Sequence, residues 1–406
     1  MAHRYRIYPN QDEAESFARH CNDTRFIWNL ALEQFNFYDR RVAGRKAPSV
    51  GERQRQLADL RKVSWLGEGA SAVQQPVLRD FKQACENWWR GTHRRPTWRK
   101  AGRSEGFCIR DVTVKVINGK WATVHVPKCG HVRFRLSRRL PEQYGMGRVT
   151  CDAAGRWHVA FSAPQPKLLH VTSGRAVGID LGIASTITTS DAAHYDAPTP
   201  EDGEKARLLR LERQFARQTK GSNRRGRTRG QIAKLKVRQA DRLKDWREKI
   251  TTELVVNNDL IVVEDLRVKN MLRSAKGTAE APGKNVKAKS GLNREIAARG
   301  WSVFTLRLEQ KAAASGVEFI KVSAKNTSRK CRKCGHTDKD NRKSQAVFRC
   351  IKCGHQTNAD INAAKNILAA GQAVSGRGGT VRPVAALAAA GKPVETSTTG
   401  SVLCAA

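Results

Sequence analysis

Four cysteines in the C-terminal part of the sequence have the spacing of a metal site. They follow the pattern Cys331-x2-Cys334-x15-Cys350-x2-Cys353, which is typical of a four-cysteine zinc ribbon. A glycine follows each pair, Gly335 and Gly354, and lets the backbone fold around an ion. Four thiolates complete a tetrahedral shell and leave no open position. We therefore expect one structural Zn²⁺ ion with no catalytic role.

Three acidic residues in separate segments form a second candidate site. Asp180 lies in the segment VGIDLG, Glu264 ends the apolar run LIVVE, and Asp360 opens the predicted helix DINAAKNIL. Strand ends and a helix start can meet at one edge of a sheet, and three carboxylates there could hold two Mg²⁺ ions. In a two-metal phosphodiester hydrolase, one ion generates the attacking hydroxide and the other stabilises the leaving oxygen.

Each of these acids also has a simpler explanation. The IDLG segment resembles the phosphate-binding turn of actin-fold kinases, which share the same sheet architecture. Glu264 could be a surface acid at a strand end, and Asp360 could only stabilise the N-terminal end of its helix through the helix dipole. The three acids alone therefore leave a nuclease and a kinase open.

The charge of the chain points to a polyanionic partner. Among 406 residues, Lys and Arg number 75 and Asp and Glu 37, which gives a net charge of +38. The basic residues occur in every segment, and nucleic acid is the commonest partner of such a chain. The alternatives are a charge-solubilised surface or binding to a membrane surface.

The cysteine pattern and the hydropathy of the chain indicate the cellular compartment in which the protein is expected. Six of the ten cysteines are scattered singly, which argues against a secreted disulfide framework and for a reducing environment. There is no apolar stretch of membrane-spanning length, and the N-terminal residues lack the apolar core of a secretory signal. We therefore expect a soluble intracellular protein, cytoplasmic and associated with the nucleoid.

The first part of the sequence predicts a strand, a helical region and a sheet. Residues 1–10 alternate like a strand, and 11–90 show the apolar spacing of helices. Residues 106–163 alternate with period two around an Asn-Gly turn at 118–119, which predicts an antiparallel sheet or barrel with a hairpin.

Tryptophans and arginines alternate at the end of the helical region. Trp88, Trp89 and Trp98 lie among five basic residues in the segment 86–100. Such aromatics can stack nucleobases while the arginines neutralise phosphates. The alternative is that the tryptophans belong to the core and the arginines are only solvated.

The second part of the sequence predicts the elements that carry the acids. Two strands joined by a glycine turn are predicted at 176–191, and further strands at 259–266 and 317–323. Residues 203–250 hold 17 Lys and Arg against 5 Asp and Glu and predict a helical hairpin broken at 221–230. Its outer face could follow a phosphate backbone. A mobile loop is predicted at 273–292, and a helix or helix pair at 293–316.

The order of these motifs resembles a known family. GIDLG, a basic helical hairpin, IVVEDL, the cysteine ribbon and NADINAAKNI follow one another as in transposon-encoded TnpB proteins. These are RNA-guided DNA endonucleases with a RuvC-like nuclease of the RNase H fold, related to type V CRISPR effectors. The resemblance covers roughly residues 1–370 and includes the opening YRIYPNQDEAESF.

The resemblance implies a multidomain α+β fold and assigns roles to residues. Asp180, Glu264 and Asp360 match the catalytic triad that holds two Mg²⁺ ions, and the four cysteines match the zinc ligands. The implied domains are a wedge first strand (1–10), a helical recognition domain (11–103), a small antiparallel wedge β-barrel (104–168), an RNase H-like RuvC nuclease domain (172–325), an inserted zinc ribbon (326–356), the final nuclease helix (357–370) and a disordered tail (371–406).

The function implied by the resemblance is RNA-guided cleavage of double-stranded DNA next to a short flanking motif. The partners would be a guide RNA derived from the transposon end and the DNA target, with no membrane, and a protein monomer would bind one RNA. A compact type V CRISPR effector and a guided DNA-binding repressor without cleavage remain alternatives. Three retained acids disfavour the repressor, because a binding protein does not need them.

Overall fold

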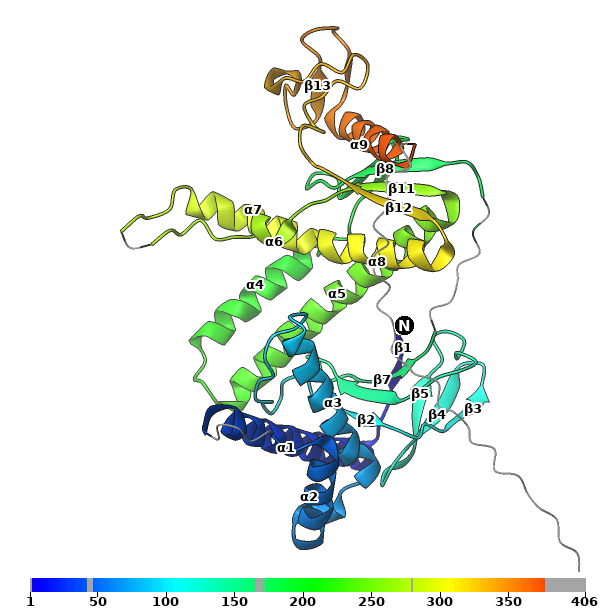
Figure 1. Ribbon diagram of the computed structural model, residues 1–406. Coiled ribbons are helices and arrows are strands. Elements are labelled where there is room, and N and C mark those ends of the chain that lie inside the picture. The colour runs from blue at the N-terminus through cyan, green and yellow to red at the C-terminus, as the bar shows by residue number, and fades with distance from the viewer. Residues whose placement is uncertain (1, 42–46, 165–169, 171, 279, 377–406) are drawn as a thin grey trace, which may run out of the picture. The chain divides into compact units, whose positions relative to one another are not determined.

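The computed structural model describes the whole chain except residues 1, 42–46, 165–169, 171, 279 and 377–406 (Figure 1). The chain divides into two compact units. The first contains Met1–Pro166 and Pro198–Trp246, and the second contains Lys167–Ala197 and Arg247–Ala406. None of the described helices is long and apolar enough to cross a membrane.

The first unit contains a seven-stranded antiparallel sheet in the order β2-β6-β7-β1-β5-β4-β3. Its strands are β1 (Ala2–Ile7), β2 (Gly106–Ile109), β3 (Val114–Asn118), β4 (Trp121–Val126), β5 (Gly130–Arg135), β6 (Gly147–Cys151) and β7 (Trp157–Ser162). The predicted first strand and the Asn-Gly hairpin are confirmed, and the Asn118 side chain accepts hydrogen bonds from the backbone of Lys120 and Trp121. The antiparallel sheet, one of the two forms that the alternation predicts, is confirmed. In the described residues its edge strands β2 and β3 do not pair with each other.

The helical region predicted at 11–90 is confirmed as α1 (Gln11–Arg41), α2 (Val50–Val63), the short 3-10 helix η1 (Trp65–Glu68) and α3 (Ser71–Trp89). Ser49 and Glu52 form a reciprocal capping box that starts α2. A core that includes Ile27, Phe35 and Phe81 joins the three α-helices. Tyr5, Phe134 and Phe161 form part of a second core under the sheet.

The basic hairpin consists of α4 (Asp202–Arg217) and α5 (Asn223–Asn257). The predicted break at 221–230 is wrong from Asn223 onward, where α5 already begins. The Ser222 hydroxyl accepts from the backbone of Arg225, and the Arg225 guanidinium donates to the carbonyls of Phe215 and Gln218 at the end of α4. These contacts confine the turn to a few residues.

The second unit is built on a five-stranded mixed sheet in the order β10-β9-β8-β11-β12. Strands β8 (Ala176–Asp180), β11 (Leu260–Glu264) and β12 (Glu318–Val322) are parallel, and β9 (Ile187–Thr189) and β10 (His194–Tyr195) are antiparallel additions. The strands predicted at 176–191, 259–266 and 317–323 are confirmed. Parallel strands covered on both faces account for their apolar runs.

Helices α6 (Val268–Met271), α7 (Val286–Arg299), α8 (Trp301–Ser315) and α9 (Ala359–Ser375) complete this unit. The prediction of a helix or helix pair at 293–316 is confirmed as a pair, α7 and α8. The loop predicted at 273–292 is wrong from Val286 onward, where α7 begins. The tail predicted from 371 is wrong up to Ser375, which is the last residue of α9, and its remainder lies largely outside the described residues.

Helix α9 lies directly on the sheet, across β8, β11 and β12 (Figure 1). Two glycines permit the close approach. A methyl group at Gly178 on β8 would lie 2.3 Å from the carbonyl oxygen of Ala364 and 2.6 Å from the backbone nitrogen of Leu368. A methyl group at Gly371 on α9 would lie 2.3 Å from the Val262 side chain. The helix that carries Asp360 is therefore held at a fixed depth above the strand that carries Asp180.

The first prediction concerns this contact. Replacing Gly178 with Ala should lower the free energy of unfolding by about 1–3 kcal/mol, because the added methyl meets backbone atoms that cannot move independently. The control is Gly226→Ala in α5, where no heavy atom lies within 4 Å and helix propensity favours Ala by about 0.5–1 kcal/mol. Thermal unfolding measures the stability of both variants against the wild type. A Gly178→Ala chain as stable as the wild type would contradict the close packing.

Candidate active site and metal centre

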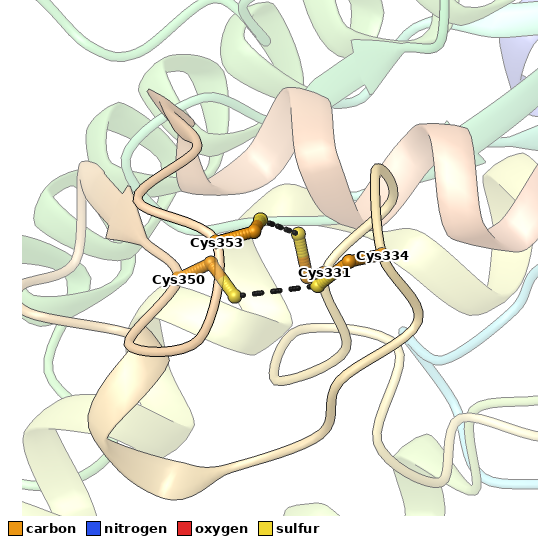
Figure 2. A group of neighbouring side chains, drawn as sticks. All are labelled: Cys331, Cys334, Cys350 and Cys353. Atoms are coloured by element: carbon orange, nitrogen blue, oxygen red, sulfur yellow. Dashed lines mark hydrogen bonds between the residues drawn. The ribbon is translucent and has the colours of Figure 1, made fainter.

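The four predicted zinc ligands lie together. The sulfur atoms of Cys331, Cys334, Cys350 and Cys353 are all within 4.8 Å of one another. The Sγ atoms of Cys331 and Cys353 are 3.7 Å apart, and those of Cys334 and Cys350 are 3.6 Å apart (Figure 2). A tetrahedral shell with Zn–S bonds of about 2.3 Å places sulfurs about 3.8 Å apart. The donor set and its dimensions therefore fit one structural zinc ion.

The two cysteine pairs have the same backbone geometry. In the first, the backbone of Cys331 donates to His336 and that of Gly335 donates to Cys331, at 2.8 and 2.9 Å; the second repeats both bonds at 2.9 and 3.0 Å. Gly335 and Gly354 have φ angles of 73° and 69°, which other residues rarely adopt. This confirms the expected role of both glycines. The two pairs come from loops on either side of β13 (Val347–Arg349).

The end of the ribbon is also the start of α9. After β14 (Gln356–Asn358), the Asn358 side chain accepts from the backbone of Asp360 at 2.9 Å and from that of Ile361 at 3.2 Å. The Ala359 backbone donates to Ala346 at 2.9 Å, beside β13. The prediction that Asp360 lies in the first turn of a helix is confirmed. The position of Asp360 therefore depends on the conformation of the last residues of the ribbon, which cap the helix.

Asp180 and Glu264 lie at the carboxyl ends of two neighbouring parallel strands. Ile179 on β8 pairs with Val263 on β11, so the acids that follow them are adjacent positions on the same sheet edge. The Asp360 carboxylate lies next to Gly182, two residues after Asp180. Within the described part of the chain, only the four cysteines form a preassembled metal cluster. The three acids share one sheet edge, but in the described structure their carboxylates do not form such a cluster.

The electrostatics of the acids reflect their proximity. Burial raises the pKa of Asp180 to about 7, and the neighbouring carboxylates of Glu264 and Asp360 act in the same direction. Burial also raises the pKa of Glu264, which a hydrogen bond from Thr327 partly offsets. Arg342 from the ribbon lies 3.4 Å from Asp360 and opposes the shift at Asp180. The site is thus an incompletely neutralised group of carboxylates, which suits cations with oxygen ligands.

Several residues of this site were not found from the sequence. Thr327 and Arg342 contact the acids from segments far away in the chain, and no local pattern marks such contacts. Asn341 is fully buried, donates to the carbonyls of Arg329 and His336, and accepts from the backbone of Ile351. Asn358 alone had a local signal, since Asn is a preferred residue just before a helix.

The three tryptophans of segment 86–100 do not share one role: one packs against the core, and two are exposed as base stacking would require. Trp88 packs against the helical core, and the guanidinium of Arg95 lies 5.2 Å from the centre of its ring. Trp89 and Trp98 are 63% and 50% exposed. Trp88 is therefore half-buried against the core, while the other two present aromatic surface that could stack bases.

A basic hollow of about 520 Å³ lies between the sheet and α5 of the first unit. Arg6, Arg156, Lys234 and Arg238 line it together with Asp241, which pairs with Arg156 at 2.9 Å. The excess of positive charge fits a phosphate backbone better than a neutral ligand.

Comparison with known proteins places the chain in a family. Residues 301–367 match the profile described as "Cas12f1-like, TNB domain", and 162–275 match OrfB_IS605, described as "Probable transposase". Residues 1–38 match a profile described as "Helix-turn-helix domain", although the described residues there form one strand and the start of one long helix.

Two relatives are similar over nearly their full length. "Putative RNA-guided DNA endonuclease InsQ" of Escherichia coli (strain K12) is 33% identical over 379 residues, 92% of this chain and 93% of the relative. A "Putative RNA-guided DNA endonuclease" of Streptomyces pristinaespiralis is 30% identical over 397 residues, 94% of this chain and 92% of the relative.

The fold also has a solved counterpart. The Cas12f1 chain in a cryo-EM structure with single-guide RNA and target DNA superposes with a TM-score of 0.55 at 16% identity, covering 88% of this chain and 83% of that chain. The chain thus has a mixed α+β fold like that of Cas12f1, together with a four-cysteine cluster. More particularly, the chain belongs to the TnpB/OrfB_IS605 family.

The second prediction concerns the metal centre. Purified protein should contain one zinc ion per chain, and Cys350→Ser should lose it, because three thiolates no longer close the shell. Metal analysis by plasma emission spectroscopy measures the content. Cys151→Ser, a half-buried cysteine of the first unit, is the control and should keep its zinc. Zinc-free wild-type protein, or a Cys350→Ser chain with full zinc, would contradict the assignment.

Proposed function

We propose that this chain is an RNA-guided DNA endonuclease that cleaves double-stranded DNA next to a short flanking motif. The observation that carries the proposal is the convergence of Asp180, Glu264 and Asp360 at one sheet edge, in a chain of the TnpB family. Asp180 and Glu264 lie within the match to the transposase profile, and Asp360 lies within the match to the TNB profile. An actin-fold kinase has no need of the ribbon or of the net charge of +38.

The three carboxylates are the residues that would hold two Mg²⁺ ions, because hard divalent cations prefer carboxylate oxygens and the acids repel one another without a counter-charge. Bound there, the ions would supply an activated hydroxide and stabilise the leaving oxygen of a phosphodiester. Arg342 neutralises part of the charge on Asp360. The resemblance implies products with 5′-phosphate and 3′-hydroxyl ends.

The rest of the chain would bind nucleic acid. We assign residues 11–103 as the recognition domain, 1–10 with 104–168 as the wedge, and 172–325 with 357–370 as the RuvC-like nuclease domain, interrupted by the ribbon at 326–356. Pairing between guide and target would read sequence, while the protein would read the flanking motif and the heteroduplex backbone. The basic hollow beside α5 and the exposed Trp89 and Trp98 are suited to such contacts.

The third prediction tests this function directly. The protein is co-expressed with its flanking genomic DNA, and the copurified complex is incubated with a plasmid library that carries the guide-matched target beside randomised bases. Cleavage should require Mg²⁺ and a defined flanking motif. Asp180→Asn should slow it by at least about 100-fold, because loss of a direct ligand exceeds the usual effect of an outer-shell change.

Asp265→Asn is the matched control. Asp265 follows Glu264 directly but is exposed, and its substitution should leave the cleavage rate unchanged. Guided binding without cleavage by the wild type would favour the repressor alternative. Full cleavage by Asp180→Asn would contradict the role of the acid site.

A further inference from the structure

Thr327 lies at the start of the ribbon and contacts one of the three acids. Its hydroxyl donates to Oε1 of Glu264 at 2.5 Å, and both side chains are 8% exposed. A second acceptor, the carbonyl oxygen of Ala324, lies further away at 3.2 Å. A hydroxyl has one hydrogen to donate, so the shorter contact to the carboxylate takes it. With Oε1 bound in this way, the second oxygen of Glu264 has a fixed direction.

Thr327 is itself held by the helix that carries Asp360. The side-chain amide of Asn366 on α9 donates to the carbonyls of Thr327 and Lys330 at 2.9 and 2.7 Å. One turn earlier, Asn362 donates to Lys330 at 2.8 Å and accepts from the backbone of Arg332 at 3.1 Å. Asn362 and Asn366 are 1% and 7% exposed. The segment from Thr327 to the first cysteine pair is therefore fastened to α9 by buried hydrogen bonds.

These contacts connect two acids that are 96 residues apart in the sequence. Glu264 is tied through its side chain to the start of the ribbon, and Asp360 is tied through Asn358 to the end of the ribbon. Asn366 joins the start of the ribbon to the helix of Asp360. A displacement of the ribbon would thus remove the hydrogen bond to the Glu264 side chain and disturb the first turn of the helix that carries Asp360.

We propose that Thr327 is a positioning residue that fixes the Glu264 carboxylate for binding divalent metal. This inference rests on the proposed function, because it takes Glu264 to be a metal ligand. Residues that hydrogen-bond a metal ligand fix its orientation, and their loss typically weakens metal binding about 10–100-fold. Thr327 touches the ligand and not the metal, so its effect must appear in metal affinity.

The test is Mn²⁺ binding to the full-length, zinc-loaded chain freed of nucleic acid, followed by the electron paramagnetic resonance signal of free Mn²⁺. Thr327→Val keeps the shape of the side chain and removes the hydroxyl, and it should weaken Mn²⁺ binding about 10–100-fold. Thr327→Ser keeps the hydroxyl and should stay within about threefold of the wild type. In the guided cleavage reaction, Thr327→Val should need correspondingly more Mg²⁺ to reach its maximal rate.

The matched control is Thr228→Val. Thr228 is 3% exposed, and among the described residues its hydroxyl donates to the backbone carbonyl of Arg224 within α5. This change removes a buried hydroxyl whose partner in the described structure is a backbone carbonyl and not an acid, and Mn²⁺ affinity should not change. Zinc content and thermal unfolding check that each variant is folded, and Thr327→Ala replaces the valine variant if that chain does not fold.

The outcomes separate the two claims. Glu264→Gln should lose Mn²⁺ binding, and if it binds like the wild type, the proposed acid site fails and the inference fails with it. If Glu264→Gln loses binding while Thr327→Val does not, the acid site stands and the positioning role is overturned. Equal loss in Thr327→Val and Thr327→Ser would also overturn it, because the hydroxyl would not be the cause.

Discussion

The mutual repulsion of three carboxylates at one sheet edge is the constraint on which the second unit depends. Burial and the two neighbouring acids raise the pKa of Asp180 to about 7, because both disfavour the charged form of the carboxyl group. The protein keeps the acids there through rigid elements. Parallel strands fix Asp180 and Glu264 by register, and α9 lies on the sheet through the glycine contacts at Gly178 and Gly371.

The ribbon is the second part of this arrangement. A zinc site of four thiolates is rigid and independent of substrate. The four-cysteine cluster of this chain fits such a site and lies between two segments that each reach the acids. Its start carries Thr327, its middle carries Arg342, and its end caps the helix of Asp360. The position of the four-cysteine cluster next to Asp360 therefore has a physical reason, since the folded ribbon fixes the geometry of the two segments at its ends.

The parts of the fold with a local cause could be predicted from the sequence. The spacing of the cysteines, the apolar runs of β8 and β11 and the Asn-Gly hairpin each depend on neighbouring residues. The start of α7 could not be predicted, because Asn285 has a φ angle of 53° and makes no side-chain capping bond. The last residues of α9 could not be predicted from their own sequence either, since Gly371 packs on Val262 from a segment distant in sequence. The contacts of Thr327 and Arg342 with the acids have the same long-range origin, and the domain assignments remain a prediction.

The central claim is that Asp180, Glu264 and Asp360 together bind divalent metal in the assembled complex. Anomalous diffraction from crystals of the full chain with its guide RNA and target DNA, soaked in Mn²⁺, measures this most directly. The account predicts anomalous peaks within bonding distance of carboxylate oxygens of all three acids, separate from the zinc peak at the four cysteines. Mn²⁺ bound elsewhere in the complex, with none at these three carboxylates, would contradict it.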